Sequence, residues 1–226
     1  MKDDYLLVWD RLDVPVDVVH PWNLQDMAGS ESGDLLDGLR FHGRFGTDLQ
    51  VLLPAGGERP CTVEEVRMHE YHLPSASCVA QRHLAVAGCG PADWLAILRP
   101  LAPGAATVAC TPMHALDRCV GAHITGAGID DRVVIGRTPC AVADHTWSFS
   151  GSAGACLRRG GAMRLVLLGA GRISAGDAVL ESDGPAAELD LSEGRAPSTR
   201  MGRGVPSPRW LAYPFPMATH DEPAWL

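Results

Sequence analysis

The sequence predicts an all-β protein, an antiparallel β-sandwich of many short strands with no large helical domain. Glycine and proline contribute 25 and 17 of the 226 residues and are spread along the whole chain, which disfavours a helix bundle and favours strands joined by turns. Several segments alternate apolar and polar residues at period two, and no amphipathic helix of three turns is evident. Hydrophobic residues make up 46% of the chain, which is enough to fill a core.

The first expected strand covers residues 5–12, an aromatic and β-branched run typical of a buried strand. Residues 14–25 continue extended, but Pro15 and Pro21 restrict them to an edge or a bent strand. Glycine, serine and aspartate predict a loop over 27–38.

A hairpin is expected over residues 39–53. Leu39 and Phe41 alternate with polar neighbours, and the Gly46-Thr47 turn leads into a second alternating run from residue 49. Further strands are expected at 62–73, 82–87, 94–99, 106–110, 120–125, 132–136, 146–150, 154–158, 163–168, 178–181 and 187–191.

The expected sandwich covers residues 1–194, which can divide into two sub-sheets, 1–113 and 114–194. Residues 195–226 contain six prolines and little periodicity, so we expect a proline-rich C-terminal tail.

The charge balance excludes several functions. A formal net charge of −8 argues against a nucleic-acid or anionic-membrane surface, so neither partner is expected. The only lysine is Lys2, which excludes a P-loop, Schiff-base or kinase-type lysine, and no cofactor is expected. No apolar run approaches the roughly 18–20 residues of a membrane helix. The first residues do not resemble a signal peptide, so the chain as written is expected to be cytoplasmic.

The seven cysteines are odd in number, widely spaced and without a Cys-x-x-Cys pair. This pattern predicts free, mostly buried thiols in a reducing compartment.

One strand carries the strongest candidate ligand-binding residues. Arg40, His42 and Arg44 fall on one face at steps of roughly 7 Å, a spacing that suits successive charges on an extended polyanion. His20 and Trp22 are expected beside them. The alternative interpretation is the solvated side of a half-buried hairpin.

Three other motifs predict no site. Gly169-Ala-Gly171 follows a strand but precedes no helix, so it predicts a hairpin turn rather than a dinucleotide loop. His69 and His72 would lie on opposite faces of a strand, so no metal is expected there. Gly151-Ser-Ala-Gly154 lacks the strand–elbow–helix context of a nucleophile, and no catalytic residue is assigned.

Several segments together resemble the C-terminal β-sandwich portion of heparinase II/III-like polysaccharide lyases. The resemblance lies in Asp4-Tyr-Leu-Leu-Val-Trp-Asp-Arg-Leu12, His20-Pro-Trp-Asn-Leu24, Asp48-Leu-Gln-Val-Leu-Leu-Pro54, Asp130-Asp-Arg-Val-Val-Ile-Gly136 and Leu165-Val-Leu-Leu-Gly169. It implies an antiparallel sandwich that in the full enzymes follows an α/α toroid. Those enzymes cleave uronate-containing polysaccharides by β-elimination, with a Tyr/His pair moving the protons. The toroid and the family's histidine- and zinc-supplying strands are missing from this sequence, so no catalytic residue or metal ligand is carried over.

The resemblance implies a module that supports or binds an acidic polysaccharide and is inactive alone. The expected partners are that polysaccharide or an upstream α/α-toroid domain or subunit. Two alternatives stay open. One is an active uronate-polysaccharide lyase in which Tyr71 acts with His20, His42 or His72, and the other is a non-carbohydrate structural or assembly module.

Overall fold

The computed structural model describes residues 5–26, 28–33, 38–43, 46–54, 61–69, 78–113, 119–191 and 198–201. Within these residues the chain forms sixteen strands and no helix, and every strand pair is antiparallel. The predicted all-β class and its antiparallel strand pairing are therefore confirmed. No helix in the described part of the chain is long and apolar enough to cross a membrane.

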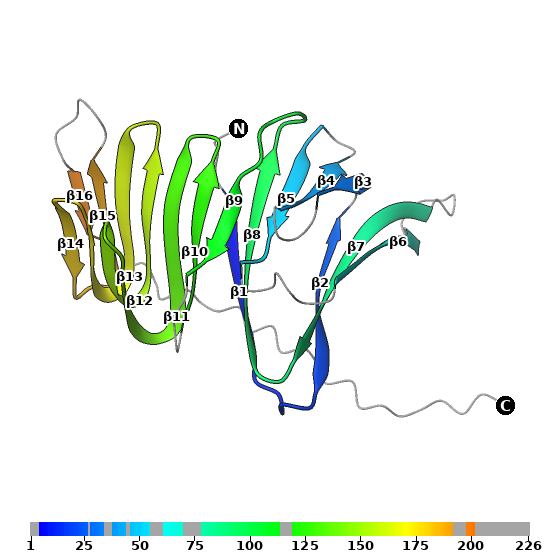
Figure 1. The fold of residues 1–226 in the computed structure, drawn as a ribbon, viewed down its shortest axis with the longest axis horizontal. Helices are drawn as coiled ribbons and strands as arrows, with labels where there is room; N and C mark the ends of the chain where they lie inside the picture. The colour runs from blue at the N-terminus through cyan, green and yellow to red at the C-terminus, as the bar shows by residue number, and fades with distance from the viewer. Residues whose placement is uncertain are drawn as a thin grey trace.

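The strands form three sheets that follow one another along the long axis of the molecule (Figure 1). The three-stranded sheet has the order β2-β7-β6 and contains β2 (Val19–Asp26), β6 (Cys61–His69) and β7 (Cys78–Cys89). The five-stranded sheet has the order β1-β8-β5-β4-β3 and contains β1 (Leu6–Leu12), β3 (Ala28–Ser32), β4 (Leu39–Gly43), β5 (Asp48–Leu52) and β8 (Ala92–Leu101).

The eight-stranded sheet contains the rest of the described chain. Its path is β16-β15-β13-β12-β11-β10-β9, and β14 also pairs with β13. The bounds are β9 (Ala109–Pro112), β10 (Cys119–Gly126), β11 (Ile129–Ala143), β12 (Trp147–Arg159), β13 (Ala162–Ala175), β14 (Ala178–Ser182), β15 (Ala186–Leu191) and β16 (Ser198–Met201).

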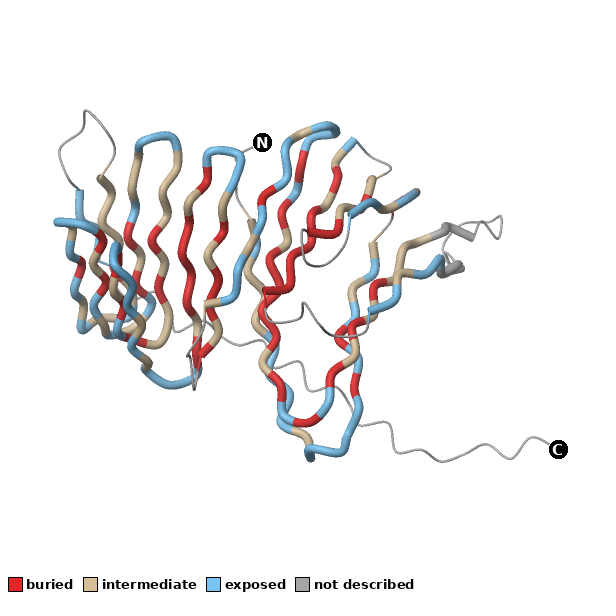
Figure 2. Tube along the Cα trace, in the orientation of Figure 1, coloured by how far each residue is buried: buried red, intermediate tan, exposed pale blue. Residues whose placement is uncertain are grey.

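The five-stranded sheet is buried on both faces. Along β5, Val51 belongs to a core shared with the three-stranded sheet, whereas its neighbour Leu52 belongs to a core shared with the eight-stranded sheet. Along β8, Trp94 belongs to the core shared with the three-stranded sheet and Leu95 to the core shared with the eight-stranded sheet. Successive side chains of a strand point to opposite faces, so this sheet is the middle layer between two packed neighbours. In Figure 2 the buried residues accordingly gather along β5, β8, β10 and β11.

A third core lies inside the eight-stranded sheet, because its long strands bend. The register of β11 against β12 shifts between Ile135 and Cys140, and that of β12 against β13 shifts between Gly151 and Ala153. Beyond this corner β13 pairs with β14, and before it β13 pairs with β15. The two halves of the sheet fold towards each other and enclose Phe149, Leu165 and Ile173.

The predicted hairpin over residues 39–53 is confirmed, with Leu39 opposite Val51 and Phe41 opposite Leu49. The loop predicted over 27–38 is wrong in part, because residues 28–32 form β3. This short edge strand has no apolar alternation, so its side chains do not predict a strand. Its main-chain hydrogen bonds with β4 hold it in the extended conformation.

Other expected boundaries also change. The strands expected at 146–150 and 154–158 are one continuous strand, β12. The predicted hairpin turn at Gly169–Gly171 is wrong, since β13 runs through this segment as a bulge and turns only at Gly176. Residues 198–201, expected in the tail, form β16 against β15, so the sheet extends past residue 194.

Candidate functional site

His20 and Trp22, two of the predicted ligand-binding residues, lie in the core of the three-stranded sheet. Their exposed fractions are 8% and 9%. His20 Nε2 is 3.0 Å from the carbonyl oxygen of Gly90, and its ring meets Trp94 edge-on. Trp22 stacks on the same indole and donates its Nε1–H to Asp10 Oδ2 at 2.8 Å. These contacts tie β2 to β1 and β8 and bury the ring faces that a sugar would need.

Arg40 and His42 lie together on β4, in a different sheet from His20 and Trp22, and both point at Asp48. Arg40 binds Asp48 Oδ2 through Nε at 2.8 Å and through a terminal nitrogen at 2.7 Å. Its guanidinium also donates to the carbonyl oxygens of Ala105 at 2.8 Å and Ala102 at 3.2 Å. His42 Nδ1 is 3.4 Å from the same Asp48 oxygen. The predicted row is thus a neutralised ion-pair cluster at Arg40 and His42, and Arg44 lies outside the described residues.

The carboxylate of Asp48 is almost fully buried. Burial opposes its charge, but the hydrogen bonds and positive charge of Arg40, the Gly43 amide and His42 prevail and lower the pKa of Asp48. This arrangement stabilises the β4–β5 hairpin.

Tyr71 and His72, the other members of the expected acid/base pair, lie outside the described residues.

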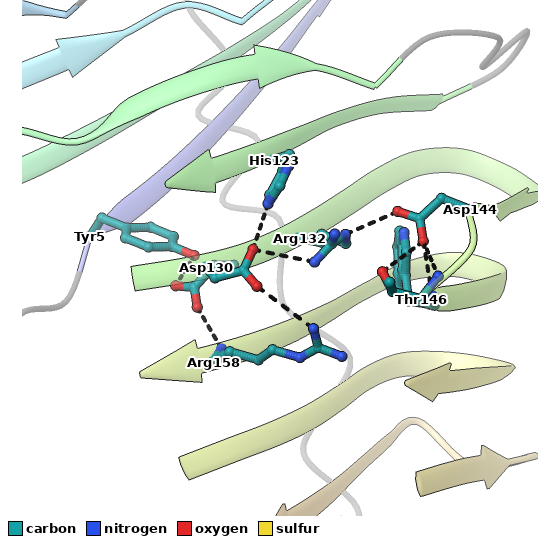
Figure 3. Close-up of polar contacts among 9 residues, drawn as sticks. Tyr5, His123, Asp130, Arg132, Asp144, Thr146 and Arg158 are labelled. Carbon is teal, nitrogen blue, oxygen red and sulfur yellow. Dashed lines mark hydrogen bonds and ion pairs between the residues drawn. The ribbon is translucent and has the colours of Figure 1, made fainter. Parts of the chain in front are cut away.

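A second polar network joins β1 to the eight-stranded sheet (Figure 3). Asp131 on β11 is fully buried and accepts hydrogen bonds from the Tyr5 hydroxyl at 3.0 Å and the Arg158 amide at 2.8 Å. Arg159 donates to Asp131 through Nε at 3.1 Å and a terminal nitrogen at 2.8 Å, and lies 5.2 Å from the Tyr5 ring centroid. Burial and the Asp131 charge raise the pKa of Tyr5, so its hydroxyl stays protonated.

The network continues across the sheet from Asp130. His123 Nε2 lies 2.5 Å from Asp130 Oδ1, Arg132 donates to the same oxygen at 3.3 Å, and a terminal nitrogen of Arg158 is 3.6 Å from Oδ2. The His123 hydrogen bond and the neighbouring guanidinium groups lower the pKa of Asp130 against its partial burial. Arg132 also reaches Asp144 at 3.2 Å. The aspartates 130, 131 and 144 balance the arginines 132, 158 and 159, so the network holds strands together without a surplus charge for a ligand.

The described surface with the most suitable binding chemistry is a cleft of about 500 Å³ between β1 and β11. We call it the Trp9 cleft; its lining residues are Trp9, Arg11, Asp13, Gly136 and Arg137. Its volume falls within the range of small-ligand sites. Trp9 is half-buried and donates its Nε1–H to Asp93 at 3.2 Å, which fixes the ring.

The two arginines of the Trp9 cleft differ in how they are held. Arg11 approaches Asp13 at 3.6 Å and Asp93 at 3.9 Å, and is 37% exposed. Arg137 is exposed, and within the described part of the chain it makes no ion pair and no side-chain hydrogen bond. A guanidinium group with free donors beside an aromatic ring is suited to an acidic ligand.

Arg137 occupies the corner at which β11 bends. Residues 136–139 lie inside the register shift, and the Cys119–Cys140 disulfide spans it. The prediction of free thiols is therefore wrong for this pair, because only the pairing of β10 with β11 brings the two residues together. Of the four free cysteines in the described part of the chain, only Cys156 is buried and Cys61 and Cys89 are exposed, so the prediction that most thiols are buried does not hold there.

The Trp9 cleft is formed by residues that lie far apart in the sequence. Trp9 stands in an apolar run and Arg137 in a separate strand 128 residues later, so no local pattern joins them. One signal was available: Gly136 and Pro139 interrupt a strand that otherwise reads as continuous, which marks a bulge.

The described residues contain no group of three or more histidine, cysteine, aspartate or glutamate side chains placed to hold a metal ion. Comparison of the chain with protein-family models, with curated proteins and with solved structures yields no match.

Proposed function

We propose that the protein is a β-sandwich module that binds an acidic saccharide in the Trp9 cleft. The observation that carries the proposal is the meeting of an indole ring and two guanidinium groups in one cleft of about 500 Å³. The proposal keeps the ligand class that the family resemblance implies and moves the site from β4 to the junction of β1 and β11.

The ligand class follows from the side chains. An indole offers a flat apolar surface on which a sugar ring can stack, and its position is fixed by the hydrogen bond from Trp9 to Asp93. Guanidinium groups bind carboxylate or sulfate oxygens through paired hydrogen bonds. Arg137 has no partner for its donors in the described part of the chain, whereas Arg11 must loosen contacts with Asp13 and Asp93 that are already long.

The charges around the cleft limit the affinity. Asp13 also lines it, and the chain as a whole carries −8, so long-range attraction does not assist an anionic ligand. Recognition therefore depends on short-range contacts with Arg11 and Arg137. We expect modest affinity that falls as the salt concentration rises.

The test is binding of a uronate oligosaccharide, measured by titration, to the wild type and to Arg137→Gln. We expect the variant to bind about tenfold more weakly, because it loses one charge-assisted contact. Arg172→Gln is the matched control. It removes the same charge from an exposed arginine that already pairs with Glu181, and we expect an effect of less than about twofold.

Trp9→Ala should weaken binding as well, with the melting temperature recorded to separate loss of stacking from loss of folding. If Arg137→Gln and Arg172→Gln weakened binding equally, the loss of affinity would be an effect of net charge. That result would contradict binding in the Trp9 cleft. The absorbance of unsaturated uronate is followed in the same samples. Its appearance would show that the protein is a lyase and would contradict the proposal of a binding module.

A further inference from the structure

We propose that the Cys119–Cys140 disulfide controls the Trp9 cleft, so that the oxidised protein binds an acidic saccharide more tightly than the reduced protein. This inference rests on the proposed function for its ligand. The structural part, that the disulfide holds the residue 136–139 segment in place, can be tested without any ligand.

The Cys119–Cys140 disulfide lies at the corner of β11. Cys119 lies opposite Gly136 in the β10–β11 ladder, which is the last pair of that ladder before the corner. Cys140 is the first residue of β11 to pair with β12 after the corner, where it lies opposite Gly151. The bond therefore joins the two sides of the segment that carries Arg137.

Within the described chain, the strand ladders hold this segment weakly. Arg137, Thr138 and Pro139 are all exposed, and none of them has a partner in the described strand ladders. Gly136 belongs to the β10 ladder and Cys140 to the β12 ladder, so main-chain hydrogen bonds hold only the ends. A cross-link next to such a segment restricts it more than the ladders alone do.

Restriction of this segment affects how tightly Arg137 can bind a ligand. An arginine held near its bound position loses less conformational entropy when a ligand arrives. Reduction leaves the β11–β12 pairs beyond the corner in place but frees Cys140 from β10. We therefore expect local loosening of residues 136–139 and a weaker contribution from Arg137, with the rest of the fold kept.

The redox step is an ordinary thiol–disulfide exchange. A thiolate of an added dithiol attacks one sulfur of the Cys119–Cys140 bond and forms a mixed disulfide, and the second thiolate of the dithiol then displaces the protein sulfur. The protein gains two electrons and two protons as two thiols, and the dithiol becomes a cyclic disulfide. Cys119 is 6% exposed, so the exchange is expected at the less buried Cys140.

The other cysteines require a control, because a dithiol acts on the whole protein. Burial raises the pKa of Cys110 to about 11, which makes that thiol a poor nucleophile, and Cys156 is fully buried. Cys89 is exposed, so Cys89→Ser is the matched variant for a cysteine outside the corner.

The experiment compares oxidised wild type, wild type reduced with dithiothreitol, the Cys119→Ser/Cys140→Ser double variant and Cys89→Ser. Titration of thiols in denatured protein should find two more after reduction in the wild type and in Cys89→Ser, and no increase in the double variant. Hydrogen exchange followed by mass spectrometry should be faster in the peptide that spans residues 135–141 of the reduced and double-variant proteins, because the ladder pairs at Gly136 and Cys140 then open more often. Circular dichroism should show the sheet retained in all four.

Binding of a uronate oligosaccharide should weaken about fivefold on reduction of the wild type and of Cys89→Ser, and should not respond to dithiothreitol in the double variant. Arg137→Gln should bind equally in both redox states, because the contact that the disulfide supports is already lost. Equal affinity of oxidised and reduced wild type would overturn the inference, and so would global unfolding on reduction or the absence of the disulfide from the thiol count.

Failure of the proposed function has a different signature. If the oxidised wild type does not bind the oligosaccharide, the acidic-saccharide proposal and the control of binding both fail. Faster exchange in the peptide that spans residues 135–141 on reduction would still support the structural part, and unchanged exchange would overturn that part too.

Discussion

Asp131 illustrates how a single residue can join distant parts of this chain. Its carboxylate is fully buried, and its oxygens accept four hydrogen bonds from Tyr5, Arg158 and Arg159. A buried charge is tolerated only when it is paired and hydrogen-bonded, so Tyr5 and Arg159 must be in place before Asp131 can be buried. The residue therefore couples the start of β1 to β11 and β12, 126 residues away from Tyr5.

The titration of Asp144 should make the free energy of unfolding depend on pH. Desolvation opposes its charge, but hydrogen bonds from the Thr146 amide and hydroxyl and from the Trp147 amide, together with the charge of Arg132, lower the pKa of Asp144 to about 2. A pKa below the unfolded value means that the ionised form favours the folded state. This stabilisation is complete above pH of about 4 and is lost as the pH falls towards 2.

We expect Asp144→Asn to flatten the pH dependence of the unfolding free energy between pH 4 and 2. The side chain is 41% exposed, so screening by solvent limits its share to about 1 kcal/mol. Urea unfolding at a series of pH values measures this slope. Asp177→Asn, in the exposed β13–β14 turn, controls for the removal of a carboxylate, and an unchanged slope in Asp144→Asn would contradict the prediction.

At the scale of elements, the long strands of the eight-stranded sheet depend on their bends. Phe149 and Gly154 stand on either side of the β12 irregularity, and the Phe149 ring lies over Gly154. A Cβ at Gly154 would come within 2.6 Å of Phe149 Cε2 and 3.0 Å of the Val166 carbonyl oxygen. The missing side chain is what allows the aromatic ring to fill the core between the two halves of the sheet.

Gly154→Ala should therefore destabilise the protein by about 1–3 kcal/mol through overpacking, measured by urea unfolding. Gly184→Ala is the matched control. A Cβ there meets only Ser182 Oγ, at 3.5 Å, and we expect a change within about 0.5 kcal/mol. Equal stability of the two variants would show that Phe149 does not need the space over Gly154.

For the whole molecule, the seam between the five-stranded and eight-stranded sheets decides whether the chain unfolds as one unit. The core of this seam contains Leu95 and Ile97 from β8 together with Ile124 from β10, each no more than 1% exposed. A shared core of this kind couples the stability of its two sides. The sub-sheets expected at 1–113 and 114–194 should thus not melt independently.

We expect Ile97→Ala to lower the unfolding free energy by about 2–5 kcal/mol and to leave a single transition. Tryptophan fluorescence and far-ultraviolet circular dichroism should give coincident curves for the wild type and the variant. Val179→Ala, which truncates a 44% exposed side chain on β14, should change stability by less than about 0.5 kcal/mol. Two separated transitions would mean that the seam does not couple the sheets.

The amino-acid sequence is enough to predict the all-β class, the β4–β5 hairpin and most strand positions, because turn residues and period-two alternation are local properties of the chain. It assigned Arg40 and His42 to one face of a strand correctly. It does not show that Asp48 and the carbonyl oxygens of Ala102 and Ala105 accept the hydrogen bonds of the Arg40 guanidinium group. Alternation predicts on which face of the strand a side chain lies, but not which other groups contact it.

Which aromatic and basic residues share a surface depends on how the three sheets pack. The indole of Trp22 is covered because the three-stranded sheet packs on the five-stranded one, whereas Trp9 lines a cleft because β1 is the edge strand beside β11. The pairing of Cys119 with Cys140 likewise depends on where β11 leaves β10, at Gly136, and bends before it pairs again with β12 at Cys140. These relations are set by packing between segments far apart in the chain, and no local pattern of residues records them.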